Sequence, residues 1–143
     1  MTVPTWMLLG FAAWTLLLLL LTIGVYRWLR VLTGRAGISE FRADQVEGQD
    51  WYKRAMRAHA NCIENLPIFG AIVFALYVGN VSGDLVNLLA TAVLIARVIQ
   101  STVHVGFVQT NTMVSIRFGF FFVQFICFFW LIAIIVIDAS SGG

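Results

Sequence analysis

Residues 2–26 read TVPTWMLLGFAAWTLLLLLLTIGVY and contain no charged side chain. A helix needs about 20 apolar residues to cross the hydrocarbon core of a bilayer, so this stretch is long enough for a membrane span. Its apolar run exceeds the roughly 7–15 residues of a signal-peptide core, and no basic segment precedes it. We therefore expect a retained first transmembrane helix.

The composition extends this expectation to the whole chain. Of the 143 residues, 60% are hydrophobic and 11% are charged, whereas soluble domains have about 25% charged residues. The mean hydropathy is +0.90. Unbroken apolar runs without period-two alternation exclude a transmembrane barrel. The predicted fold class is an all-α integral membrane protein, a bundle of four transmembrane helices in one domain, residues 1–143.

The ends of the apolar runs and the turn residues give the expected boundaries. The second helix begins between Asp44 and Lys53, and the polar segment 79–84 is the predicted turn before the third. The four helices are expected at about residues 5–27, 48–78, 85–105 and 113–137.

The positive charges predict the orientation. Residues 27–57 hold seven of the nine Lys and Arg residues, and basic loops stay on the cytoplasmic side. With four spans, both termini lie outside, the connector 106–112 lies inside, and the short loops favour a bacterial inner membrane. The lipid bilayer is the expected partner, whereas a net charge of +2 gives no support for nucleic-acid binding.

Polar side chains inside the spans are candidates for function because a charge there costs about 2.5–3.5 kcal/mol on insertion scales. They form two stripes at helical spacing and one arginine near the start of the fourth helix. The antiparallel topology brings all of them into the cytoplasmic half of the bilayer. Such a set can bind a small ligand with several carboxylates and one ammonium group. No metal site is predicted. The candidates are Arg57, Asn61 and Glu64 in the second helix, Arg97, Gln100 and His104 in the third, and Arg117 in the fourth.

Two other interpretations remain open. Polar side chains in membrane helices also join helices, at about 0.6 kcal/mol per hydrogen bond, and Arg97 with Glu64 can form a structural ion pair. A small transporter that uses Glu64 as a proton relay is a further alternative. Three intramembrane arginines disfavour a cationic substrate for such a transporter.

Residues 57–69, RAHANCIENLPIF, resemble the signature of the MAPEG family, the membrane-associated proteins in eicosanoid and glutathione metabolism. That signature has Arg-Ala, then Asn, Glu, Pro and Phe at this spacing. The four-helix layout, the long polar first loop and Arg97-Val98 extend the resemblance over most of the chain. Within the family the chain resembles bacterial members that are similar to microsomal glutathione transferase.

The resemblance implies a homotrimer that holds glutathione as co-substrate between neighbouring subunits, near the cytoplasmic face. Small lipophilic substrates enter from the bilayer. His104 stands where many members have a tyrosine. The glutathione-binding residues that the resemblance implies are Arg57, Asn61, Glu64, Arg97 and His104. Gln100 is added to them because it lies on the same polar stripe of the third helix.

The chain departs from the family pattern at the arginine that lowers the thiol pKa in active members. The ungapped counterpart is Met113, and the nearest arginine is Arg117. If Arg117 is the catalytic residue, the protein is a glutathione-dependent transferase or peroxidase for lipophilic electrophiles or hydroperoxides. If no arginine serves, it is a non-catalytic lipid- or ligand-binding membrane protein of the same fold.

Overall fold

The computed structural model describes residues 1–42 and 46–142. Within these ranges the regular elements are all helices, and no strand is present. The prediction of an all-helical fold with four potential spans is therefore confirmed. The stretches that are long and apolar enough to cross a membrane are Val3–Leu32, Asp50–Val78, Asp84–Gly106 and Asn111–Ser141.

The first span is one continuous helical stretch that continues beyond the predicted end at residue 27. It consists of α1 (Val3–Leu18), the π-helical segment η1 (Leu19–Gly24) and α2 (Val25–Leu32). At its end the Arg35 N–H donates to the Arg30 carbonyl at 2.9 Å, and Gly34 has a φ of +70°. This glycine-based cap ends the helix. The predicted end at residue 27 was set by the first basic residue after the apolar run, Arg27, and the helix continues past it.

The other boundaries agree with the predicted ones to within a few residues. A short 3-10 turn, η2 (Ile38–Glu40), precedes α3 (Asp50–Val78), which begins inside the interval predicted for it; the first residue of that interval, Asp44, lies outside the described residues. After α4 (Asp84–Gly106), α5 (Asn111–Ser141) starts before residue 113 and ends beyond residue 137. Its earlier start has a local cause, since the Thr110 hydroxyl accepts a hydrogen bond from the Met113 N–H at 3.3 Å, which caps the helix.

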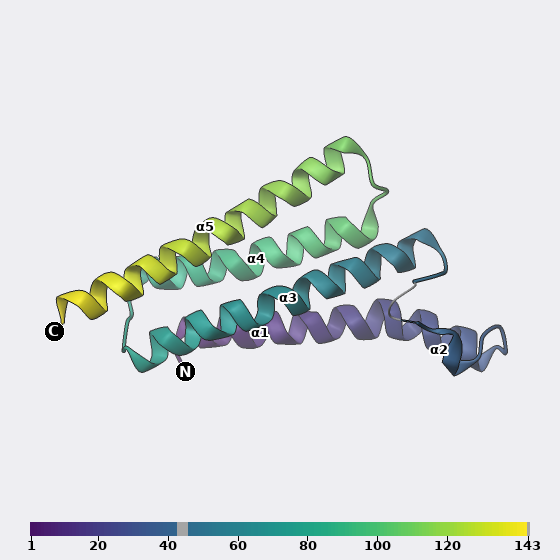
Figure 1. The fold of residues 1–143 in the computed structure, drawn as a ribbon, viewed down its shortest axis with the longest axis horizontal. Coiled ribbons are helices and arrows are strands. Elements are labelled where there is room, and N and C mark those ends of the chain that lie inside the picture. The colour runs from purple at the N-terminus through teal and green to yellow at the C-terminus, as the bar shows by residue number, and fades with distance from the viewer. Residues whose placement is uncertain (43–45, 143) are drawn as a thin grey trace.

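The helices form an antiparallel bundle in which α4 lies between α5 and the α1–α3 pair (Figure 1). Both termini lie at one end of the bundle. The α2–α3 loop and the α4–α5 connector lie at the other end. The start of α3, the end of α4 and the start of α5 therefore meet at the same end, as the predicted topology requires.

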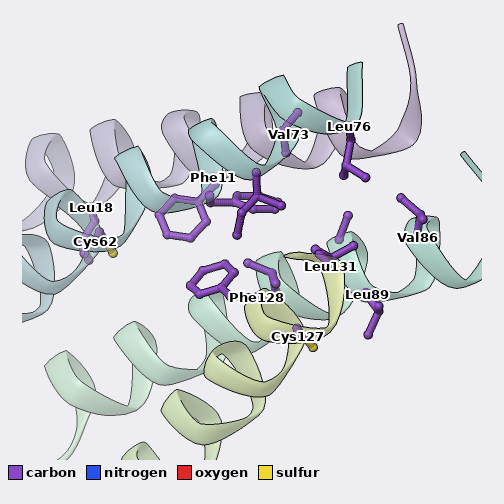
Figure 2. Close-up of a cluster of buried hydrophobic side chains, with 14 of the residues drawn as sticks. Phe11, Leu18, Cys62, Val73, Leu76, Val86, Leu89, Cys127, Phe128 and Leu131 are labelled. Atoms are coloured by element: carbon purple, nitrogen blue, oxygen red, sulfur yellow. The ribbon is translucent and has the colours of Figure 1, made fainter. Parts of the chain in front are cut away.

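Apolar side chains of α1, α3, α4 and α5 meet in one buried cluster in the interior of the bundle (Figure 2). Phe69 of α3 lies between two other rings, with centroids 5.8 Å from Phe11 of α1 and 5.9 Å from Phe128 of α5. In lipid, such close packing drives helix association because the surrounding chains are as apolar as the side chains. This cluster holds α1, α3 and α5 together.

A second, smaller cluster joins α2 to the start of α3. The rings of Tyr26 and Tyr52 stack with centroids 4.1 Å apart, and the Arg27 Nε donates to the Tyr52 hydroxyl at 2.8 Å. Ile23 and Ala55 complete the buried part of this cluster. The contacts fix the first turns of α3, the helix that carries the first polar stripe.

Candidate functional site

The polar stripe of α4 faces the interior of the bundle. Arg97, Gln100 and His104 are 1%, 7% and 6% exposed. Their spacing of three and four residues keeps them on one face, and α4 has neighbours on both sides. These side chains therefore contact other helices and not lipid.

A pocket of about 200 Å³ brings together four of the seven predicted site residues. Asn61 comes from α3, Gln100 and His104 come from α4, and Arg117 comes from α5. The rings of Phe118 and Phe121 supply an apolar wall on the α5 side. The pocket thus combines a cation, two amides and an imidazole with an aromatic surface.

A chain of hydrogen bonds orients the pocket residues of α4 and α5. The amide nitrogen of Gln124 donates to Oε1 of Gln100 at 2.9 Å, and the Gln100 amide nitrogen donates to the backbone carbonyl of Arg117 at 3.4 Å. Gln124 is 1% exposed, and its Oε1 has no partner among the described residues. Gln124 was not among the site residues predicted from the sequence. A polar residue two helical turns after Arg117, inside a phenylalanine-rich run, could have indicated that it shares a helix face with Arg117.

Arg117 and Met113 lie in different surroundings. Arg117 lines the pocket, whereas Met113 does not. Met113 lies in the first turn of α5, where its backbone N–H donates a hydrogen bond to the hydroxyl of the capping residue Thr110. Of these two positions, the pocket lining therefore includes that of Arg117 and not that of Met113.

The remaining two residues of the α3 stripe lie outside the pocket lining. Arg57 and Glu64 are both exposed on α3. Arg57 is still near enough to interact electrostatically with His104 and Arg117. Three groups that carry or can carry positive charge therefore gather at one end of the bundle.

Arg97 points into the bundle instead of the pocket. Its guanidinium carbon lies 5.4 Å from the centroid of the Phe11 ring, and its Nε and Nη2 have no hydrogen-bond partner among the described residues. Glu64 is near enough to act on its charge, but the two form no ion pair in residues 1–42 and 46–142. The suggested Arg97–Glu64 ion pair is thus not formed among the described residues, and Arg97 is not part of the pocket lining.

The comparisons with known proteins agree with the fold. A sequence model of the MAPEG family matches residues 10–137, a range that includes most of each of the four helical spans. A search of curated proteins finds no match.

Proposed function

The chain belongs to the MAPEG family, and on that premise we propose that it is a glutathione-dependent membrane transferase or peroxidase. Family membership and four apolar helices make it an integral multi-pass membrane protein. The proposed substrates are lipophilic electrophiles or hydroperoxides dissolved in the bilayer. The proposed catalytic residue is Arg117.

The observation that carries this proposal is the position of Arg117 beside Asn61, Gln100 and His104 in one pocket. A guanidinium next to a sulfur atom favours the thiolate over the thiol because it stabilises the negative charge. The amides and the imidazole can hydrogen-bond the peptide groups of glutathione. The residues present therefore fit a small thiol peptide.

The reaction needs no nucleophile from the protein. With an aromatic halide, the glutathione sulfur forms a bond to the ring carbon, the carbon–halogen bond breaks, halide leaves, and the thiol proton passes to water. With a hydroperoxide, two molecules of glutathione are oxidised to the disulfide while the hydroperoxide is reduced to an alcohol and water. In both reactions Arg117 stabilises the attacking thiolate, and Phe118 and Phe121 offer an apolar surface to the other substrate.

The size of the pocket supports a site shared between subunits. A volume of about 200 Å³ is below the roughly 300–1,000 Å³ of most ligand pockets. Arg57 and Glu64 lie exposed next to it on α3, where a second subunit can cover them. We propose a homotrimer in which Glu64 binds the ammonium group and Arg57 a carboxylate of glutathione. The contact predicted for Arg97 stays a prediction, because its side chain lies against Phe11.

We also propose the orientation that the basic loop indicates. The site then lies in the cytoplasmic leaflet of a bacterial inner membrane, and both termini lie outside.

A non-catalytic protein that binds a lipid or another ligand is the second candidate function. It is favoured by the departure from the family pattern described above, in which Met113 is the ungapped counterpart of the activating arginine. In that case glutathione or a lipid binds without turnover.

The test measures the ultraviolet difference spectrum of glutathione bound to the purified protein, together with glutathione-dependent conjugation of an aromatic halide. A bound thiolate with turnover supports the enzyme. Bound thiol without turnover supports the second candidate. If glutathione does not bind at all, the proposed enzyme is wrong.

A further inference from the structure

A second pocket, which we call the basic pocket, opens at the end of the bundle where α3 begins. It has a volume of about 170 Å³ and lies between the first turns of α3 and the connector after α4. Three basic side chains and one carboxylate give its lining two excess positive charges. The lining residues are Asp50, Lys53, Arg54, Arg57, Val108 and Gln109.

Among the residues that the structure describes, the basic side chains of this pocket have no carboxylate partner. The Arg54 Nε donates to the backbone carbonyl of Val105 at 3.3 Å, which ties the guanidinium to the end of α4. Within the part of the chain that the structure describes, neither Lys53 nor Arg54 forms an ion pair, with Asp50 or with any other carboxylate. The positive charge of the pocket is therefore available to an external anion.

The apolar wall of the basic pocket indicates that it lies at the membrane surface. The connector between α4 and α5 carries Phe107 and Val108, which are 52% and 71% exposed. An aromatic and an aliphatic side chain exposed at the end of two membrane helices favour contact with lipid over contact with water. A basic pocket beside such side chains is at the level of the lipid headgroups.

We propose that the basic pocket binds the phosphodiester group of an anionic phospholipid. Lys53 and the free nitrogen atoms of Arg54 donate charge-assisted hydrogen bonds to the phosphate oxygens, and the glycerol and first acyl carbons lie over Val108. Basic pockets next to membrane helices commonly bind such headgroups. The two excess positive charges favour a headgroup with net negative charge over zwitterionic phosphatidylcholine. Arg57 also belongs to the proposed glutathione site, so the lipid contacts are assigned to Lys53 and Arg54 alone, which with Asp50 still leave one excess positive charge in the lining.

The test titrates the purified full-length protein in neutral detergent with dihexanoyl phosphatidylglycerol, followed by calorimetry. Dihexanoyl phosphatidylcholine and glycerol 3-phosphate are titrated in parallel, the first to remove the net charge and the second to remove the acyl chains. The variant Lys53→Gln removes one charge from the pocket. Arg35→Gln is the matched control, because Arg35 is exposed in the α2–α3 loop outside the pocket lining. Arg57 is not varied because it belongs to the proposed glutathione site.

We expect phosphatidylglycerol to bind and the other two compounds to bind much more weakly. Lys53→Gln should weaken phosphatidylglycerol binding about fivefold, since one basic residue near a lipid surface contributes about 1 kcal/mol. Arg35→Gln should leave it unchanged. Melting curves and circular dichroism of both variants should match those of the unmodified protein.

Several outcomes would overturn the proposal. If phosphatidylcholine binds as tightly as phosphatidylglycerol, the net charge of the headgroup plays no role. If glycerol 3-phosphate binds as tightly as phosphatidylglycerol, the pocket binds a free phosphate group and not a lipid. Equal losses in the two variants mean that only overall charge matters, and displacement of the lipid by glutathione assigns the pocket to the glutathione site. Binding of phosphatidylglycerol by a protein that does not bind glutathione would instead contradict the proposed function alone.

Discussion

Arg97 and Arg117 are both arginines within membrane helices, yet their surroundings differ. Arg97 lies in the interior of the bundle, 1% exposed, against the Phe11 ring and with two nitrogen atoms unpartnered among the described residues. Arg117 is half-buried and lines a pocket with Asn61, Gln100 and His104. The same residue type thus occupies a fully buried interior position in one case and a half-buried, pocket-lining position in the other.

The difference follows from which helices surround each side chain. Arg97 is on the face of α4 that packs against α1, whereas Arg117 is at the end of α5 where the pocket opens toward α3 and α4. An intramembrane charge is a functional candidate by default. The comparison teaches that the charge alone does not decide whether an intramembrane arginine lines a pocket; the packing of the neighbouring helices does.

Replacing Arg117 by Met should have the largest effect. We expect glutathione conjugation to fall about 100-fold, as when one preorganised electrostatic stabiliser is removed from an enzyme, because the thiolate loses its neighbouring cation. Steady-state rates with an aromatic halide measure this. The control is the double variant that adds Met113→Arg to Arg117→Met. Because Met113 is outside the pocket lining, the new arginine should not restore activity. Recovery by that second change would show that the pocket geometry assigned to Arg117 is incorrect.

Glu64→Gln should have the next largest effect, on binding. Loss of a charged hydrogen bond to the glutathione ammonium costs about 1.5 kcal/mol or more, so affinity should fall at least about tenfold. Calorimetry with glutathione and with its N-acetyl derivative measures the effect. The derivative lacks the ammonium group and should bind the variant and the unmodified protein equally. Asp138→Asn, a charge removal at the other end of the bundle, serves as the control. A similar loss for both ligands would rule out the assigned ammonium contact.

Gln124→Leu should have a smaller effect. The change removes the hydrogen bond to Gln100, and such bonds between membrane helices contribute about 0.6 kcal/mol, so glutathione affinity should fall about threefold. The double variant with Gln100→Leu should lose little more than Gln100→Leu alone, because both changes remove one shared contact. Strictly additive losses would mean that Gln124 does not act through Gln100.

Arg97→Met should have the smallest effect and is the most direct test of the comparison. Arg97 buries a charge without a carboxylate ion-pair partner among the described residues, and an apolar side chain of similar length avoids the cost of burying that charge. We therefore expect an unchanged or raised melting temperature in detergent and an unchanged glutathione affinity. If affinity instead falls as far as in Glu64→Gln, Arg97 contacts the ligand, as the family resemblance implies, and the contrast with Arg117 disappears.

The polar stripes were predictable because helical periodicity determines which residues share a face. Arg97, Gln100 and His104 do share the interior face of α4. The membership of the pocket was not predictable in the same way. It depends on how α5 packs against α4, and the Gln124–Gln100 hydrogen bond that joins them links residues 24 positions apart in the chain.

The amino-acid sequence alone determined the helical spans, the family and the end of the bundle at which polar residues gather. Hydrophobic length and the spacing of charges are local properties, and in lipid a backbone without water partners has to form helices. Only the tertiary structure separated Arg117 from Arg97, excluded Met113 from the pocket lining and assembled the basic pocket from α3 and the α4–α5 connector. These features depend on the rotation and register of one helix against another, which arise from contacts between distant side chains such as Phe11, Phe69 and Phe128.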